Sequence, residues 1–163
     1  MWPIFPEIRS MPNKPASALL DTSVLVRFTA PADPLHHQTV EALAKIAGEN
    51  TILCICPQVM AEFRQVATRP EKSNGLGWDS DRAARAMDAF EREFSLLPEP
   101  HSTYIAWRRI VETVKAVGRA NFDARIVAVA EAQHIEAVLT YEADAFARYG
   151  AISSVLILRP KDI

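Results

Sequence analysis

The chain has 163 residues, of which 49% are hydrophobic, and its formal net charge is -2. This length suits one well-cored domain and is short for two. Because 18 Lys and Arg residues are scattered among 20 Asp and Glu residues, no overall positive field predicts nucleic-acid or membrane binding. Any nucleic-acid partner must therefore be engaged locally.

The chain begins with a Pro-rich segment that lacks the apolar core of a signal peptide. We expect residues 1–15 to be an extended lead-in, with Met1 or Met11 as the initiator, and residues 16–163 to form one domain. No apolar run approaches the roughly 18 to 20 residues that cross a bilayer. We expect Cys54 and Cys56 to be buried free thiols, which favours a reducing cytoplasm.

The first half of the domain alternates between strand and helix signals. The predicted elements are strands at 17–20 and 51–55 and helices at 22–29, 36–49 and 57–68. Pro57 suits the first turn of its helix, because its missing backbone N–H costs nothing there. The stretch RPEKSNGLGWD at 69–79 gathers Pro, Asn-Gly and Gly and predicts a loop.

The second half continues this alternation. Its predicted elements are helices at 80–93, 102–118, 123–134 and 142–150 and strands at 94–97, 136–140 and 153–158. Gly118 supplies the expected stop of the second of these helices. The helix at 123–134 is rich in Ala and Val and is expected to be buried on most sides. Short strands separated by helices predict an α/β sandwich with a mainly parallel central sheet flanked by helices.

Carboxylates follow the predicted strands at the edge where such folds bind ligands. Asp21 comes directly after the first strand, and by itself it is typical of a helix N-cap. Glu142 and Asp144 follow the strand at 136–140, Glu62 lies about a turn and a half into the helix after the second strand, and Asp123 begins the Ala-rich helix. We therefore expect segments far apart in the sequence to bring acids to one rim of the sheet.

A cluster of this kind needs a neutralising partner. Two unit charges about 4 Å apart repel by roughly 4 kcal/mol at an effective dielectric constant of 20. Arg64 and Arg125 are only sequence neighbours of the acids, so we expect no basic side chains to pair with all of them. A hard divalent cation such as Mg²⁺ accepts oxygen ligands and keeps several waters. Bound there, it lowers the pKa of a coordinated water and offsets charge on a phosphoryl group.

Four motifs in order resemble the PIN-domain nucleases, and especially the VapC-like toxins of bacterial toxin–antitoxin pairs. They are LLDTSVLV, AEF, FDARIVAVA and VLTYEADAFARYG, and the resemblance spans about residues 16–160. It implies a PIN-like three-layer sandwich and an Mg²⁺- or Mn²⁺-dependent endoribonuclease that hydrolyses phosphodiester bonds in RNA. It also implies a cognate antitoxin that inserts a peptide segment near the acidic pocket, and a homodimer.

The resemblance assigns roles to individual acids. Asp21 matches the first metal-binding acid, and Thr22 or Ser23 matches the small hydroxyl residue that supports it. Glu62 matches the acid of the second helix. Asp123 matches the acid of an element in which many relatives carry His where this chain has Phe122.

The fourth acid is ambiguous between two neighbours. Glu142 falls where relatives have Asn or Asp, and Asp144 falls on a later acid. We favour Asp144 slightly as the ligand of a second metal or its waters. Arg119, Arg125, Arg148 and Lys72 are expected as outer phosphate contacts.

Other readings of the sequence were weighed. A dehalogenase-like phosphatase requires a second Asp two residues after the first, where this chain has Ser23. A receiver domain requires a Lys after a late strand, which VLTYEA lacks. A noncatalytic PIN-like module that binds protein or RNA stays open, as does a nuclease for DNA or for RNA processing.

Aromatic residues carry two further expectations. Tyr104 and Trp107 share a helical stripe, which favours a core or dimer contact over a base-stacking platform. Phe28, Trp78 and Phe90 are expected to form an exposed groove for a partner.

Overall fold

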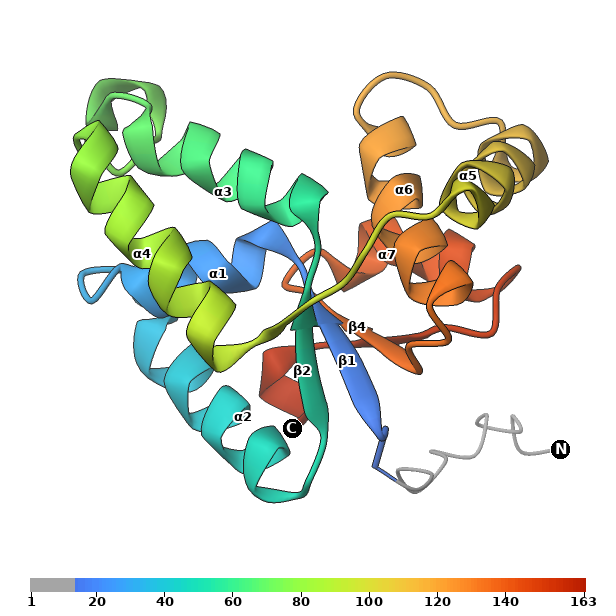
Figure 1. Ribbon diagram of the computed structural model, residues 1–163, viewed down its shortest axis with the longest axis horizontal. Coiled ribbons are helices and arrows are strands. Elements are labelled where there is room, and N and C mark those ends of the chain that lie inside the picture. The colour runs from blue at the N-terminus through green and yellow to red at the C-terminus, as the bar shows by residue number, and fades with distance from the viewer. Residues whose placement is uncertain (1–13) are drawn as a thin grey trace, which may run out of the picture.

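The computed structural model describes residues 14–163 and shows one five-stranded sheet between two groups of helices (Figure 1). The strands are β1 (Ser17–Leu20), β2 (Ile52–Ile55), β3 (Ser95–Leu96), β4 (Ala137–Leu139) and β5 (Leu156–Leu158). The helices are α1 (Thr22–Thr29), α2 (His36–Gly48), α3 (Pro57–Thr68), α4 (Ser80–Glu93), α5 (His101–Val114), α6 (Ala120–Ala132) and α7 (Ala143–Gly150), with 3₁₀ turns η1 (Glu71–Ser73) and η2 (Pro160–Asp162). The predicted α/β sandwich is confirmed. The expected lead-in at 1–15 and the choice between Met1 and Met11 fall largely or wholly outside the described residues.

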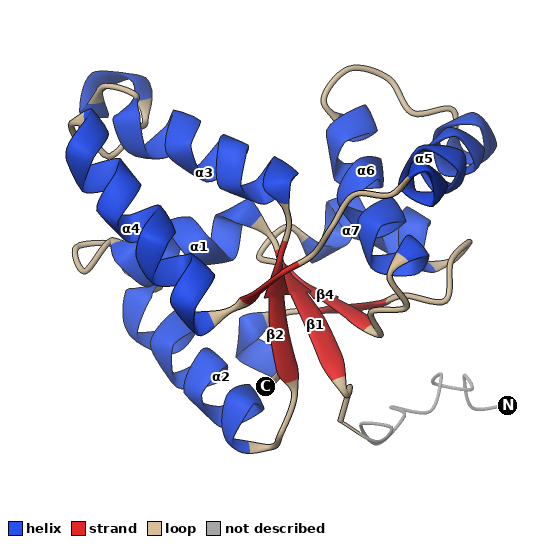
Figure 2. Cartoon of the chain, viewed as in Figure 1, coloured by secondary structure: helices blue, strands red, loops and turns tan. Residues whose placement is uncertain are grey.

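The sheet is entirely parallel and its strand order is β3-β2-β1-β4-β5. Helices α1 to α4 pack against one another on one side, and α5 to α7 pack together on the other (Figure 2). The chain runs outward from β1 through β2 to β3 and then returns to β4 and β5. The order therefore reverses between β1 and β4, and open parallel sheets bind ligands at the carboxyl ends of the strands beside such a switch point.

The central strands fix the two chain segments that leave the sheet at this point. Leu20 of β1 pairs with Leu139 of β4, and both side chains are fully buried. The next backbone N–H, that of Asp21, donates to the Leu139 carbonyl over 3.0 Å. Asp21 and Thr140 therefore leave the sheet side by side, although 119 residues separate them in the sequence.

Helix α5 ends four residues earlier than predicted. Lys115 adopts a left-handed conformation with φ of 53°, and the Ala116 N–H donates to the Val111 carbonyl over 3.0 Å. Gly118, the expected stop, instead takes φ of 58° in the turn that leads into α6, where its carbonyl accepts from the Asn121 N–H. As a result α6 begins at Ala120, three residues before the prediction, and Asp123 lies in its first turn.

The expected exposed groove of Phe28, Trp78 and Phe90 is wrong. Phe90 is 2% exposed, and Phe28 and Trp78 are partly buried against the core. The ring of Phe63, which is fully buried on α3, meets Phe90 with centroids 4.9 Å apart and Trp78 at 6.1 Å. These rings join α3 to α4 and to the loop between them, because burial and edge-to-face contact both stabilise aromatic pairs.

The two cysteines are buried and free, as predicted. Burial raises the pKa of the Cys56 thiol to about 11 and also raises the pKa of Cys54. Both thiols therefore stay protonated and pack as small hydrophobic groups. Within residues 14–163, no helix combines the length and the apolar character that crossing a membrane requires.

Phe63→Ala should lower the free energy of unfolding by about 3–5 kcal/mol, because it leaves a cavity in the aromatic cluster. Urea unfolding followed by circular dichroism measures the change. Phe122→Ala is the matched control, since the Phe122 side chain is 58% exposed and its loss should cost no more than about 0.5 kcal/mol. Equal losses in the two variants would contradict the assigned core.

Candidate active site

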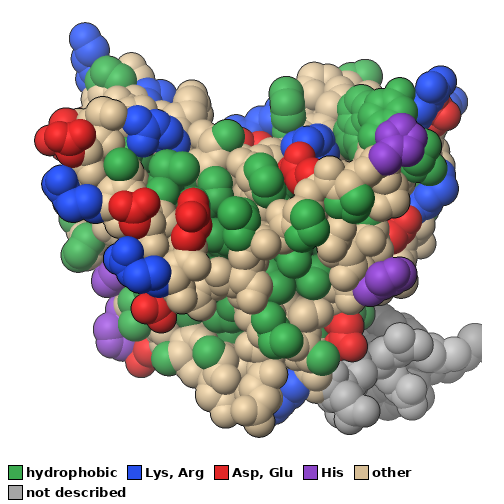
Figure 3. Space-filling view, in the orientation of Figure 1, with side chains coloured by type: hydrophobic (Ala, Val, Ile, Leu, Met, Phe, Trp, Pro, Cys, Tyr) green, Lys and Arg blue, Asp and Glu red, His purple; other side chains and the backbone are tan. Residues whose placement is uncertain are grey.

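A cavity of about 310 Å³ opens at the carboxyl ends of β1 and β4, next to the switch point of the sheet. Figure 3 shows the surface hollowed between the side that carries α3 and α4 and the side that carries α5 and α6. Five carboxylates from five separate segments line this cavity, namely Asp21, Asp33, Glu62, Asp123 and Glu142. Asp33 lies in the loop between α1 and α2, and its Oδ1 accepts from the Leu35 backbone N–H over 2.8 Å. We call it the acid cavity.

Asp21 is held rigidly at its wall, with a 5% exposed side chain. Its Oδ1 accepts from the Thr22 backbone N–H over 2.8 Å, which caps α1. Its Oδ2 accepts from the Ser23 hydroxyl over 2.6 Å and from the Thr140 hydroxyl over 2.7 Å. Asp21 is thus both a helix cap and a cavity residue, and the two readings of this acid do not exclude each other.

Glu62 is fixed by two side chains that also line or border the cavity. The Thr22 hydroxyl donates to its Oε2 over 3.0 Å, and the Gln58 amide donates to its Oε1 over 2.7 Å. Gln58 also donates to the Phe122 carbonyl over 2.9 Å. Gln58 lies on α3 and bonds to Glu62 on the same helix and to Phe122 on α6. These two bonds hold Glu62 close to Asp123, the residue that follows Phe122.

The surroundings of Asp123 disfavour the ionised form of its carboxyl group. Its pKa is raised from 3.8 to about 6, first by burial and then by the negative charges of Glu142, Asp21 and Glu62. Among the described residues, no hydrogen-bond donor reaches its carboxylate, although the Arg119 guanidinium partly offsets the shift. The acids therefore lie near enough to repel one another through the cavity.

The structure separates the two contenders for the fourth acid. Glu142 lines the acid cavity and contributes to the raised pKa of Asp123. Asp144 points away, forms an ion pair with Arg159, and its side chain is 95% exposed. The Thr140 hydroxyl accepts from the Glu142 backbone N–H over 2.9 Å, so the same turn that holds Asp21 also aims Glu142. The preference for Asp144 does not agree with this geometry.

Arginines lie closer to the acids than the sequence indicated. Arg27, Arg69 and Arg119 all line the acid cavity, but none of them forms an ion pair with its acids among the described residues. The Nε atoms of Arg27 and Arg69 are buried and have no hydrogen-bond partner among the described residues. Each arginine donates through another nitrogen, Arg27 to the Ser23 carbonyl and Arg69 to the Asn74 carbonyl.

Of the four expected phosphate contacts, Arg119 alone lines the acid cavity. Arg125 is ion-paired with Glu99, and Arg148 donates to the Tyr149 hydroxyl over 2.8 Å. Lys72 lies on the exposed turn η1. The sequence missed Arg27, Gln58 and Thr140. Thr140 alone had a usable signal, since it stands at the end of a predicted strand.

The donor chemistry of the acid cavity fits a hard divalent ion. Its acidic lining is made of carboxylates, with the Thr22 and Ser23 hydroxyls beside them and no His or Cys, and oxygen ligands of this kind suit Mg²⁺ or Mn²⁺. Within residues 14–163, no three His, Cys, Asp or Glu side chains stand close enough to chelate an ion as they lie. Asp21 and Glu62 turn their oxygens toward hydroxyl and amide donors, so chelation requires rotation of these side chains.

Asp123→Asn should stabilise the metal-free protein at pH 7 to 8, by on the order of 1 kcal/mol at this half-exposed position. Above pH 6 the folded parent carries the full repulsion at Asp123. As the pH falls through about 6, it takes up a proton that the unfolded chain does not yet bind. The advantage of the variant therefore shrinks toward pH 5. Urea unfolding in EDTA measures the difference in the free energy of unfolding between variant and parent. Asp88→Asn, on the exposed face of α4, is the control. An Asp123→Asn variant less stable than the parent at pH 7.5 would refute the repulsion.

Solved structures similar to this chain share its fold at low sequence identity. VapBC-1 from nontypeable Haemophilus influenzae has a TM-score of 0.67 at 15% identity, over 89% of this chain and 98% of that chain. VapBC-5 from Mycobacterium tuberculosis, a member of the VapBC family of toxin–antitoxin systems, has a TM-score of 0.57 at 23% identity, over 89% and 99%. VapC20 from the same organism, a sarcin–ricin loop cleaving toxin, has a TM-score of 0.57 at 17% identity, over 80% and 93%.

The search of curated proteins found no match. The family model for the PIN domain matches residues 18–152, which is most of the chain and includes all five acids of the cavity. The implied PIN-like sandwich is therefore confirmed, and the chain belongs to the PIN-domain family.

Proposed function

We propose that this protein is an Mg²⁺- or Mn²⁺-dependent endoribonuclease and the toxin of a toxin–antitoxin pair. One observation carries the proposal. Asp21, Glu62, Asp123 and Glu142 come from four distant segments and line one cavity at the switch point of the sheet. The raised pKa of Asp123, to which burial and the charges of Glu142, Asp21 and Glu62 contribute, supports a site whose acids act together.

Asp21, Glu62 and Asp123 would hold the ion, with Glu142 in place of Asp144 as the fourth acid. When bound, the ion supplies a water of lowered pKa and neutralises charge on the phosphate. Thr22, Ser23 and Thr140 position the carboxylates through their hydroxyl groups.

The arginines of the acid cavity suit a phosphodiester substrate. Arg27 and Arg69 line the cavity, and Arg119, which also lines it, is exposed. A guanidinium binds phosphate oxygens in a fixed fork geometry. Local capture by these groups replaces the overall positive field that the net charge of -2 does not provide.

The toxin assignment rests on the likeness to VapBC-1, VapBC-5 and VapC20, which is a likeness of fold. We propose a cognate antitoxin that inserts a segment at the acid cavity, a homodimer, and a cytoplasmic location. A noncatalytic PIN-like module is the main alternative. The complete set of acids favours the enzyme, because a binding module has no need of carboxylates held together against repulsion. DNA cleavage and RNA processing are outcomes of the experiments below.

Asp21→Asn and Asp123→Asn should each slow the cleavage of single-stranded RNA by 100-fold or more, because each removes a charged metal ligand. EDTA should abolish cleavage by the parent, and Mg²⁺ or Mn²⁺ should restore it. The assay follows a labelled RNA on a denaturing gel, with a DNA of the same sequence beside it and Asp88→Asn as the control. Cleavage by both ligand variants at the parent rate would refute the assignment.

The pair Glu142→Gln and Asp144→Asn decides the fourth acid. Glu142→Gln should slow cleavage by at least tenfold, because Glu142 lines the acid cavity. Asp144→Asn should stay within about twofold of the parent, because the Asp144 side chain is exposed and paired with Arg159. The reverse ranking would restore Asp144 to the site.

Expression of the parent in a bacterium should arrest growth, and expression of Asp21→Asn at the same level should not. Arrest follows if the cleaved RNA is essential. Colony counts after induction, with immunoblots for protein level, measure the difference. Growth arrest by Asp21→Asn as well would count against a catalytic toxin.

A further inference from the structure

A second cavity, of about 290 Å³, lies where the chain enters α5. Its lining residues are Glu99, Pro100, His101, Thr103, Tyr104, Trp107 and Arg125. We call it the aromatic cavity. Its lining is mostly apolar and aromatic, with a few polar groups, a combination typical of sites that orient a flat polar ligand.

Two buried polar atoms of the aromatic cavity have no partner. Thr103 is 3% exposed, and within residues 14–163 neither its hydroxyl nor the buried Oε1 of Glu99 has a hydrogen-bond partner. Glu99 Oε2 is committed to Arg125 over 2.5 Å. In the part of the chain that the structure describes, four buried side-chain atoms are unpaired, and the other two belong to Arg27 and Arg69 of the acid cavity. An unpaired buried polar group costs about 1–3 kcal/mol, so each such atom is a candidate ligand contact.

The wall of the aromatic cavity is a row of rings on α5. His101 stacks on Tyr104 with centroids 5.9 Å apart and planes 29° apart, and Tyr104 lies 5.9 Å from Trp107. Tyr104 is 48% exposed, so of the two expected roles, a core or a dimer contact, the core role does not hold and the dimer contact stays a prediction. In the space-filling view, hydrophobic side chains and a histidine gather on the side of the molecule that carries α5 (Figure 3). Exposed rings in a row offer a stacking surface for a base.

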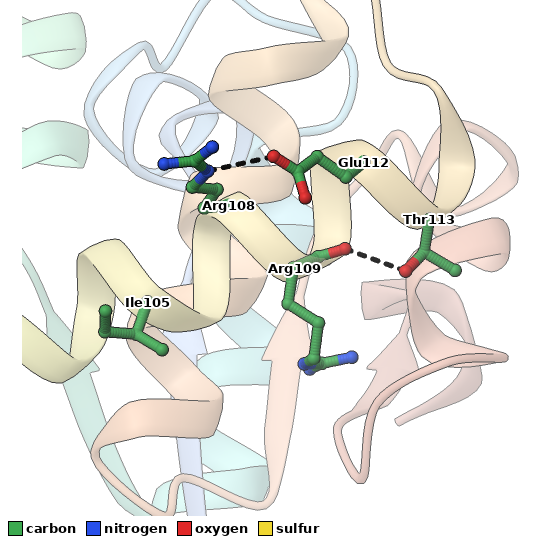
Figure 4. A pocket seen from close by; sticks show the side chains of 5 residues that line it. All are labelled: Ile105, Arg108, Arg109, Glu112 and Thr113. Carbon is green, nitrogen blue, oxygen red and sulfur yellow. Dashed lines mark hydrogen bonds and ion pairs between the residues drawn. The ribbon is translucent and has the colours of Figure 1, made fainter.

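The neighbouring hollow on α5 lacks these properties. It is lined by Ile105, Arg108, Arg109, Glu112 and Thr113 (Figure 4). Arg108 donates to Glu112 over 2.9 Å, and Arg109 binds both oxygens of Glu131 over 2.6 and 2.7 Å. Its charged groups are already paired, so the unsatisfied chemistry of α5 is confined to the aromatic cavity.

Hydrogen bonds join the aromatic cavity to the acid cavity. Arg125 binds Glu99 through one nitrogen and donates to the Gln58 Oε1 over 3.0 Å through the other. Gln58 in turn donates to Glu62. The Trp107 indole N–H donates to the Asn121 carbonyl over 2.8 Å, two residues before Asp123. A ligand that occupies both cavities therefore contacts two ends of one hydrogen-bonded unit.

We propose that the aromatic cavity binds an unpaired nucleobase of the RNA substrate, at a nucleotide that flanks the cleaved phosphate, and that it prefers bases with an exocyclic amino group. The inference rests on the proposed ribonuclease function. The base stacks on the row of rings, and its amino group donates to Glu99 Oε1. Uracil is disfavoured, because its two carbonyl oxygens flank its one ring N–H and repel a carboxylate. The Thr103 hydroxyl completes the base contact.

Cytosine and uracil give the sharpest test, because they have the same ring size and differ in the amino group. The probes are fluorescein-labelled hexacytidylate and hexauridylate, and the protein is the full chain carrying Asp21→Asn, which prevents cleavage. Fluorescence anisotropy should show hexacytidylate bound about tenfold more tightly than hexauridylate. Equal Kd values for the two probes would overturn the proposal.

Single substitutions in the same background locate the preference. Glu99→Gln should remove or invert it, because an amide N–H₂ toward the base favours the uracil carbonyl. Thr103→Val should weaken hexacytidylate several-fold without lowering Tm, since it removes an unpaired buried hydroxyl. Tyr104→Ala should weaken both probes about tenfold through lost stacking. Ile105→Ala, on the exposed face of the same helix, is the matched control and should change neither Kd.

The results that would contradict the base site differ from those that would contradict the ribonuclease. If Glu99→Gln and Thr103→Val keep the parent ratio, or Ile105→Ala weakens binding as much as Tyr104→Ala, no base site exists there. If Tyr104→Ala abolishes self-association in sedimentation while RNA binding is unchanged, the cavity is a contact between copies of the chain. A parent that cleaves RNA without this preference overturns only the base site. A parent that shows the preference but does not cleave overturns the ribonuclease.

Discussion

The mutual repulsion of carboxylates at the junction of β1 and β4 is the constraint on which the rest of the structure depends. Burial and the negative charges of Glu142, Asp21 and Glu62 raise the pKa of Asp123 to about 6. The fold offsets this cost with fixed dipoles: two hydroxyls and a backbone N–H on Asp21, and a hydroxyl and an amide on Glu62. Several carboxylates in one cavity destabilise a fold unless a positive charge offsets their repulsion, and this is the reason for proposing a cation site.

The parallel sheet makes this arrangement possible. Buried pairing of Leu20 with Leu139 sets Asp21 beside Thr140, and Thr140 then bonds to Asp21 and to the backbone of Glu142. The Gln58 side chain joins α3 to α6 and accepts a hydrogen bond from Arg125, which extends this network away from the acid cavity. The acid cavity and the aromatic cavity are therefore parts of one polar network laid over an apolar sheet. A substrate that spans both would place its phosphate in the acid cavity and a base in the aromatic cavity.

Much of the fold could be predicted from local patterns. The pattern predicts the helix over 80–93 at its observed bounds, because the preceding loop, which is rich in Pro, Asn and Gly, marks its start. Asp21, Glu62 and Asp123 were found because position after a strand or at a helix start is a local property. The choice between Glu142 and Asp144 was not, since it depends on how Thr140 turns the chain after β4. The positions of Arg27 and Arg69 at the cavity could not be predicted, because their long side chains reach it from positions outside any motif. The exposure of Tyr104 could not be predicted, because periodicity gives the face of a helix on which a residue lies and not whether that face is covered.

The most direct measurement is anomalous diffraction from crystals of the parent soaked in Mn²⁺. The account predicts an anomalous peak in the acid cavity, with oxygens of Asp21 and Asp123 about 2.0–2.3 Å from the ion. Glu62 or Glu142 should complete the protein ligands directly or through water. A protein that binds Mn²⁺ elsewhere, with these carboxylates still turned to their hydroxyl and amide donors, would contradict the central claim.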